Sequence, residues 1–286
     1  MSLRRLPFVL VVAASAWSLQ VRAREPFPVP FVVEHHVIDG SLGSPVAGET
    51  VRDSYGGNFL VSERPDGTRT IVDLARHEVT EVRPKEGTYW SLSFSRFAEL
   101  HRRLEEAEST GEGEKRRAQG SGERPAIRIE VITEATSPAS RGALSAAAAS
   151  GKRLRASAEG GPSLDVWLDE SGPRLSPEAI AALAEFERAV LGTTDGSVGP
   201  ADLLEATRKR EGGALAVRTR RIVSRAPGSR DDGPVLETVV TKAAPVASLS
   251  PDLVKVPEGL RRIPSPLELV VSWAEDEAAL RQRGRR

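Results

Sequence analysis

Apolar and polar residues alternate with a period of two along several segments of this chain, a pattern that predicts β-strands with one buried face. The clearest segments are FVVEHHVID (31–39), TYWSLSF (88–94), AIRIEVI (126–132) and SLDVWLDE (163–170). In the first three, the apolar residues that should share a face are Phe31, Val33, Trp90, Leu92, Phe94, Ile127 and Ile129, with Tyr89 opposite. Two later segments, 213–224 and 234–244, read as a strand pair joined by a long hairpin loop over 225–233.

Four other segments have the three-to-four-residue spacing of amphipathic helices. They are 93–106, 176–192, 199–210 and the C-terminal 265–286. The second should begin at Ser176 as N-cap, and its apolar stripe includes Leu183 and Phe186. The last should begin with a capping box formed by Ser265 and Glu268.

Roughly eight to ten strands in meander order with few helices predict an α+β fold, in which a curved antiparallel sheet has helices covering one face. We expect a single domain over 24–264, interrupted by low-complexity insertions near 105–124 and 136–162, and followed by a C-terminal helix or tail. The second insertion has a candidate strand near 153–157. Clefts between such layers commonly bind apolar ligands.

The N-terminus has the order of a secretory signal peptide: Arg4 and Arg5, an apolar run, and Val21-Arg22-Ala23. We expect cleavage after Ala23, or after Ala16 if the apolar region is shorter; the alternative is an uncleaved anchor. The protein should therefore be periplasmic or secreted. There is no cysteine near the cut to carry a lipid, and no later run long and apolar enough to span a membrane.

Net charge and cysteine content exclude several classes of function. The whole chain has a net charge of zero, and the leader carries three arginines and no acid, which leaves the remainder slightly acidic. This argues against a nucleic-acid partner held by phosphate neutralisation. The absence of cysteine excludes thiol nucleophiles, disulfides and cysteine metal ligands.

The histidines do not form a catalytic or metal-binding pattern. His35 and His36 are adjacent on a predicted strand, so their side chains should point to opposite faces and cannot chelate together. His77 should lie exposed in a turn, and His101 on the apolar side of a helix. There is no Gly-x-Ser-x-Gly nucleophile elbow.

The acidic residues near Trp167 do not suggest a glycosidase. Asp165 and Asp169 share one strand face at roughly 13 Å, which is too far for an acid/base pair. We expect both on the solvent face of the strand. The sequence thus predicts no catalytic residues, no metal site and no cofactor.

Three stretches resemble a known family, and one of them is LDVWLDE (164–170), which is similar to a strand carrying Trp that precedes a helix in that family. In residues 56–94 a strand is followed by Ile71-Val72-Asp73-Leu74 and then by Val79, Val82, Pro84 and Tyr89. Residues 248–264 end with Val256, Pro257 and Gly259 in the order of that family's last turn. Together they resemble the periplasmic lipoprotein carriers LolA and LolB over roughly 30–264, and most closely their uncharacterised secreted members. Leu253 and Leu260 stand where the family usually has aromatic residues, and its acyl-binding positions have no match here.

That resemblance implies an unclosed antiparallel half-barrel with helices covering its concave face and an apolar cavity for acyl chains. A ligand-binding cleft would be lined by Phe31, Val33, Trp90, Leu92, Phe94, Ile127, Ile129, Leu183 and Phe186; alternatively these residues are ordinary core. The expected function is a non-enzymatic binder or carrier of a lipid or a lipoprotein acyl chain. The alternative is an envelope interaction or stress-sensor protein that binds a protein partner, and a hydrolase with an unrecognised site is a third hypothesis.

Overall fold

The computed structural model describes residues 25–39, 48–109, 125–132, 152–158, 163–168, 173–191, 198–222 and 235–284. The expected signal peptide, most of the two low-complexity insertions and the loop at 225–233 lie outside the described residues.

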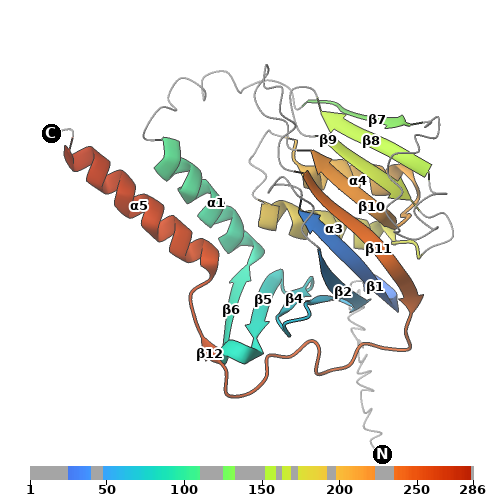
Figure 1. Ribbon diagram of the computed structural model, residues 1–286, viewed down its shortest axis with the longest axis horizontal. Helices are drawn as coiled ribbons and strands as arrows, with labels where there is room; N and C mark the ends of the chain where they lie inside the picture. Colours follow the sequence, from blue (N-terminus) through green and yellow to red (C-terminus); the bar gives the residue numbers. More distant parts are fainter. Residues whose placement is uncertain are drawn as a thin grey trace, which may run out of the picture.

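The strands form one open sheet in the order β12-β6-β5-β4-β3-β2-β1-β11-β10-β9-β8-β7 (Figure 1). Their bounds are β1 Phe27–Asp39, β2 Glu49–Gly57, β3 Phe59–Glu63, β4 Arg69–Asp73, β5 Glu78–Arg83, β6 Thr88–Ser93, β7 Ile127–Val131, β8 Lys152–Ala158, β9 Ser163–Leu168, β10 Ala216–Ile222, β11 Val235–Pro245 and β12 Arg261–Arg262. Only β12 pairs in parallel, with β6, and the other described pairings are antiparallel. The predicted α+β class with an unclosed antiparallel sheet is confirmed.

The bounds of the described helices are α1 Phe94–Ser109, α3 Pro177–Leu191, α4 Pro200–Arg210 and α5 Pro266–Gly284, with a short 3-10 turn, η1, at Pro84–Glu86. Two of the helices, α3 and α5, begin where local capping predicts. Ser176 Oγ accepts a hydrogen bond from Ala179 N at 3.1 Å. Ser265 and Glu268 form the predicted capping box, with Ser265 N donating to Glu268 Oε2 at 2.8 Å and Glu268 N to Ser265 Oγ at 3.2 Å.

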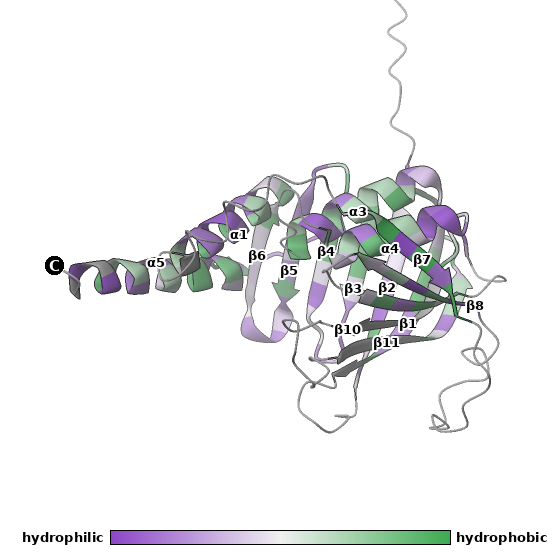
Figure 2. Ribbon diagram, turned by 90° about the horizontal axis from the view of Figure 1, so that it is seen from above, coloured by the Kyte–Doolittle hydropathy of each residue, from purple (hydrophilic) through white to green (hydrophobic). Residues whose placement is uncertain are grey.

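Helices α1 and α3 cover the concave face of the sheet, and α5 packs on α1. Together they bury the largest apolar cluster, which we call the first core. Its buried members are Phe27, Phe31, Val33, Leu60, Val72, Leu74, Val79, Trp90, Leu92, Phe94, Phe97, Leu100, Leu175, Ala179, Ile180, Leu183, Ala189 and Val271. Trp90, Leu92 and Phe94 therefore point to the helices, as their alternation predicts. Figure 2 shows α1 and α3 lying on the same side of the sheet.

Helix α4 covers the other end of the sheet, where a second core forms against β8 and β9. Its buried members are Leu154, Ala156, Ala158, Leu164, Val166, Leu168, Val198, Leu203 and Ala214. Leu164, Val166 and Leu168 belong to this core and Trp167 does not, which is the alternation that a strand over SLDVWLDE predicts. The candidate strand near 153–157 is also confirmed, as β8.

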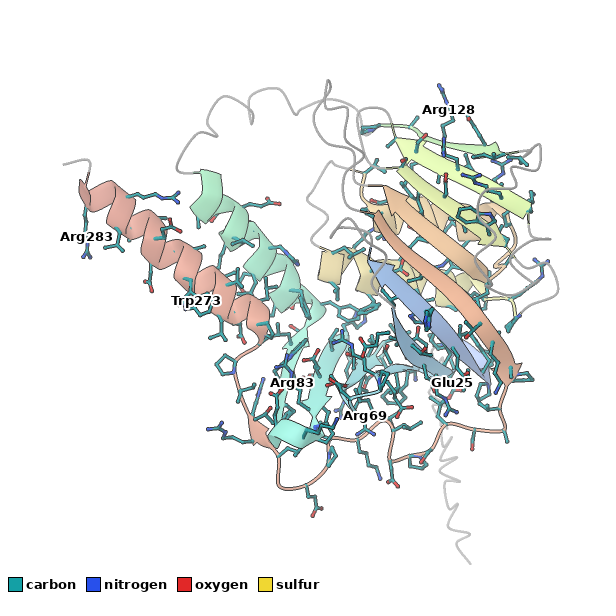
Figure 3. The ribbon with its side chains drawn as sticks, in the orientation of Figure 1. Glu25, Arg69, Arg83, Arg128, Trp273 and Arg283 are labelled. Atoms are coloured by element: carbon teal, nitrogen blue, oxygen red, sulfur yellow. The ribbon has the colours of Figure 1, made fainter. Side chains whose placement is uncertain are left out.

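A third, smaller cluster lies on the convex face of the sheet, under the segment that leads from β11 to β12. Val61, Ile71 and Val82 are buried there, and Tyr89 and Leu253 pack against them. Tyr89 thus lies opposite Trp90, as predicted. Arg69, labelled in Figure 3, holds the covering segment by donating to Asp252 O at 3.0 Å and Lys255 O at 2.8 Å.

The prediction that Asp165 faces solvent is wrong, and Asp169 lies outside the described residues. Asp165 is only 2% exposed. Arg155 lies directly opposite it on β8, and both Arg155 and Arg153 donate to its carboxylate. The two guanidinium groups, both from β8, cover the acid, because side chains of adjacent strands on the same sheet face lie close enough to interact.

Candidate binding surfaces

The structure brings seven of the nine predicted cleft residues together. Phe31, Val33, Trp90, Leu92, Phe94 and Leu183 belong to the first core, and Phe186 packs against it. Ile127 and Ile129 instead pack against the second core under α4. The sheet is wide enough that one concave face carries two separate apolar clusters, so the nine residues do not line a single site.

The seven residues contact one another and their neighbours closely. Phe31 stacks on Tyr55 with ring centroids 4.5 Å apart, and Trp90 meets Phe97 edge to face at 6.1 Å. Phe94, the first residue of α1, contacts Phe186 of α3 with ring centroids 5.9 Å apart. A ligand that reaches this surface must therefore take the place of side chains from the helix layer.

A group of polar side chains lies under α3 and α4 beside the first core, and we call it the concave polar cluster. It consists of His35, Asp53, Tyr55, Ser62, Glu187 and Arg208. His35 Nδ1 lies 3.4 Å from Asp53 Oδ2. Arg208 donates to both carboxylate oxygens of Glu187, at 2.9 and 2.8 Å, and so joins α4 to α3.

Burial raises the pKa of two members of this cluster, Asp53 and Tyr55. Burial raises the pKa of Asp53, and the opposing effects of His35 and a hydrogen bond from Ser62 are smaller. Burial also raises the pKa of Tyr55 well above its usual value; nearby Asp53 adds to this, and Arg208 opposes it. The tyrosine therefore stays protonated.

Replacing Asp53 with asparagine is expected to raise the unfolding temperature at pH 7, because the ionised carboxylate is disfavoured at this site. Since the folded-state pKa of Asp53 is raised, its contribution to stability is present below its unfolded pKa of about 3.9 and is lost as pH rises through the folded value. In thermal unfolding scans, the increase in unfolding temperature caused by Asp53→Asn should become smaller as pH falls toward 4. Asp66 is the control, because hydrogen bonds from Thr68 lower its pKa, so Asp66→Asn should lower stability at pH 7. A destabilised Asp53→Asn variant at pH 7 would contradict the prediction.

The concave polar cluster does not have the order of a catalytic triad. Ser62 and His35 both interact with Asp53, which places the carboxylate in the middle. A triad needs the imidazole between hydroxyl and carboxylate. His36 bonds Thr50 Oγ1 at 2.8 Å instead, away from the cluster.

The remaining histidines hold α3 in place at its margins. His77 is half-exposed in the β4–β5 turn, as predicted, and its Nδ1 lies 2.8 Å from Glu185 Oε1. His101 on α1 is partly buried, with Nε2 3.2 Å from Val190 O. Within the described ranges, no group of three or more acids and histidines could hold a metal ion, and no helix is long and apolar enough to cross a membrane.

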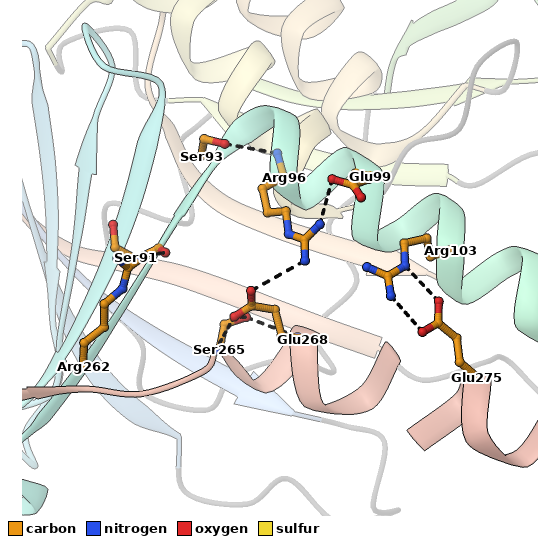
Figure 4. Close-up of polar contacts among 9 residues, drawn as sticks. All are labelled: Ser91, Ser93, Arg96, Glu99, Arg103, Arg262, Ser265, Glu268 and Glu275. Carbon is orange, nitrogen blue, oxygen red and sulfur yellow. Dashed lines mark hydrogen bonds and ion pairs between the residues drawn. The ribbon is translucent and has the colours of Figure 1, made fainter. Parts of the chain in front are cut away.

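The outer face of α5 is the other notable surface. Its inner face packs on α1 through Val271, and Arg103 bonds Glu275 bidentately at 2.8 Å (Figure 4). On the outer face Leu269, Trp273 and Leu280 are 43%, 68% and 65% exposed. The helix itself was predicted from the sequence, but its second apolar side was not.

A cavity of about 330 Å³ lies between α3, α4 and β7. Its lining residues are Pro125, Ile127, Arg188, Val198, Asp202, Glu205, Ala206 and Lys209. Arg188 bonds Asp202 at 2.8 Å and also Glu205, and Lys209 pairs with Glu205 at 2.7 Å. Charged side chains that already satisfy one another make this wall unsuited to an acyl chain.

Comparison with known proteins gives only distant structural likenesses. No family model matches the chain, and no curated protein sequence matches it. An uncharacterized conserved protein from Thermus thermophilus is similar at a TM-score of 0.38 and 7% identity, over 83% of this chain and 91% of that one. PNGF-II, in its P21 crystal form, is similar at a TM-score of 0.35 and 7% identity; the match covers 86% of this chain but 33% of that one.

Sequence alternation could have found part of the concave polar cluster. Asp53 and Tyr55 alternate with Ser54 in VRDSYGG, and Tyr55 had to face the core if that segment were a strand. Glu187 and Arg208 carry no such signal, since both read as solvent-facing positions of amphipathic helices.

Proposed function

We propose that this protein is a non-enzymatic, periplasmic or secreted binder of an apolar ligand, a lipid or a lipoprotein acyl chain, held between the concave face of the sheet and helices α1 and α3. One observation carries the proposal. Five of the seven phenylalanines in a chain with only 5% aromatic residues gather at this one interface. Aromatic and aliphatic side chains are the usual lining of apolar ligand sites.

Ligand entry at this interface requires α3 to move away from the sheet. Its apolar face, with Ile180 and Leu183, is buried against the first core. The contacts at its margins are polar, namely His77 with Glu185 and His101 with Val190 O. An acyl chain that replaced the face of α3 would keep the sheet covered, so that the exchange need not expose apolar area.

Replacing Glu185 with glutamine should increase the rate of ligand uptake several-fold, because it removes the charge that ties α3 to His77. Uptake can be followed by native mass spectrometry after mixing the exported protein with phospholipid vesicles. Glu86→Gln is the matched control, since Glu86 also pairs with a basic side chain, Arg83 at 3.5 Å, but belongs to the η1 turn between β5 and β6. Equal uptake by both variants would contradict a role for α3 as the moving part.

The proposed function itself is tested by native mass spectrometry of the protein purified from the envelope of a bacterial host, with solvent extraction alongside. A reproducible added mass that extracts as phospholipid or acylated peptide is the expected result. A protein mass that stays unshifted even after incubation with phospholipid vesicles would reject the proposal and assign these residues to the core alone.

A second candidate, an envelope interaction or sensor protein that binds a protein partner, is favoured by a different observation. Trp273 and Leu280 are exposed on α5, and the described parts of the chain leave most of both side chains open to solvent. Exposed tryptophan is typical of binding hot spots. Neither candidate involves nucleic acid.

A further inference from the structure

Four residues form a straight line along the outer face of α5, and we call this line the outer stripe. They are Leu269, Trp273, Asp276 and Leu280, at successive spacings of four, three and four residues. This is the spacing of a helix seam that packs against a second helix. Three of the four positions are apolar, so the stripe has the composition of an interface rather than of a solvated surface.

The outer stripe is accessible without any rearrangement of the fold. The opposite side of α5 carries Val271, which is buried in the first core, and Glu275, which is bound to Arg103 on α1. A second tie joins Arg96 to Glu268 at 3.9 Å (Figure 4). Helix α5 lies outside α1 and extends beyond the sheet, and Figure 3 labels Trp273 on it.

The stripe is complementary to itself. When two copies of α5 run antiparallel about the midpoint between Trp273 and Asp276, Leu269 of one copy meets Leu280 of the other, and Trp273 meets Asp276. All four residues of one copy therefore face a residue of the other copy in this single alignment of the two helices. A two-fold axis requires a surface of this kind, in which contacts occur twice with the roles exchanged.

We propose that two copies of this chain associate through the outer stripes of α5 in this antiparallel register. The Trp273 indole N–H of each copy then donates to the Asp276 carboxylate of the other, while the leucine pairs exclude water at both ends. The chain already uses this bond internally, where Trp90 Nε1 donates to Glu81 Oε1 at 3.1 Å. Asp276 is available for it, since it forms no ion pair within the described parts of the chain.

The expected dimer is weak and reversible. A helix of 19 residues is about 28 Å long, so two such helices bury an area at or below the small end of stable interfaces. The two Asp276 carboxylates also lie near the axis, where their like charges oppose association. Association should therefore occur in the micromolar range, and it is independent of the proposed carriage of an apolar ligand.

Sedimentation equilibrium of the full exported chain from about 1 to 200 μM tests the inference. The expected result is a mass that rises from one to two chains with concentration. Trp273→Ala should weaken association at least ten-fold, and Asp276→Asn should strengthen it several-fold, because asparagine keeps the acceptor and removes the like charge. Val29→Ser is the control, because Val29 is 66% exposed but lies on β1, and it should leave association unchanged.

Circular dichroism of each variant confirms that it is folded, since all the changed residues are exposed. A single-chain mass at every concentration would overturn the inference, as would a dimer that Trp273→Ala leaves intact. Weaker association of Asp276→Asn would also contradict this register, in which repulsion between the two carboxylates near the axis outweighs the stronger hydrogen bond that a charged acceptor makes. A single-chain mass would point to a different protein as the occupant of the stripe.

Discussion

Replacing Gly213 with alanine is expected to lower the free energy of unfolding by at least about 3 kcal/mol. Gly213 has a φ of +81°, and a Cβ there would lie 2.1 Å from Leu175 O and 3.0 Å from Leu175 C. Both atoms belong to the backbone and cannot swing aside. Gly213 O also accepts from Leu175 N at 2.8 Å, so the contact fixes the chain just before α3 to the end of α4.

Gly259→Ala separates the backbone strain from the collision. Gly259 has nearly the same φ, +84°, but nothing lies within 4 Å of a Cβ built there. The free energy of unfolding of Gly259→Ala should therefore fall only by the cost of placing alanine at positive φ, about 1–2 kcal/mol. Urea unfolding of the two variants measures both losses. Similar losses would show that Leu175 retreats easily and that α3 is not held by this contact.

Features set by neighbouring residues were predictable from the sequence. The capping box at Ser265 and Glu268 and the N-cap at Ser176 act within one turn, so their residue types alone locate the helix starts. Alternation placed Trp90 and Tyr89 on opposite faces, because successive side chains of a strand must point apart. The α+β class follows from the same local patterns.

Features that depend on which distant segments meet were not predictable. Ile127 and Ile129 alternate as regularly as Trp90 and Leu92, yet they belong to a different core, because strand order in the sheet decides which helix covers them. The pairing of Glu187 with Arg208 depends on how α3 crosses α4. Neither segment contains that information by itself.

The second apolar side of α5 is a different case, since its sequence signal is present. Leu269, Trp273 and Leu280 are spaced as regularly as the residues that pack on α1. One neighbouring helix can bury only one side. A helix is normally assumed to have one apolar side, which is buried, and under that assumption the exposed apolar side of α5 was not predicted.

The burial of Asp165 leads to the second large effect: Asp165→Asn should lower the free energy of unfolding at pH 7 by about 2–4 kcal/mol. Arg155 Nε and Arg153 Nη2 each donate to the carboxylate at 2.7 Å. Arg153 also lies over the Trp167 ring, 4.8 Å from its centroid. Without the carboxylate, two guanidinium groups face each other across a neutral amide. Arg155 is 43% exposed, so solvent screens part of the repulsion between the two guanidinium groups. This screening limits the expected loss of stability.

The pH dependence distinguishes lost charge from lost packing. Burial alone would raise the pKa of Asp165, but the hydrogen bonds from Arg155 and Arg153 outweigh it and hold the pKa below its usual value. Because the folded pKa is lowered, the stabilisation is present above the unfolded pKa of about 3.9 and is lost as pH falls through the folded value. The difference in free energy of unfolding between Asp165→Asn and the unchanged protein, measured by urea unfolding, should therefore become smaller below pH 4. Glu277→Gln, which breaks an exposed pair with Arg281, should cost far less at pH 7. A deficit that stays constant from pH 7 to pH 3 would mean that the asparagine is poorly packed, and that the two arginines do not depend on the charge of Asp165.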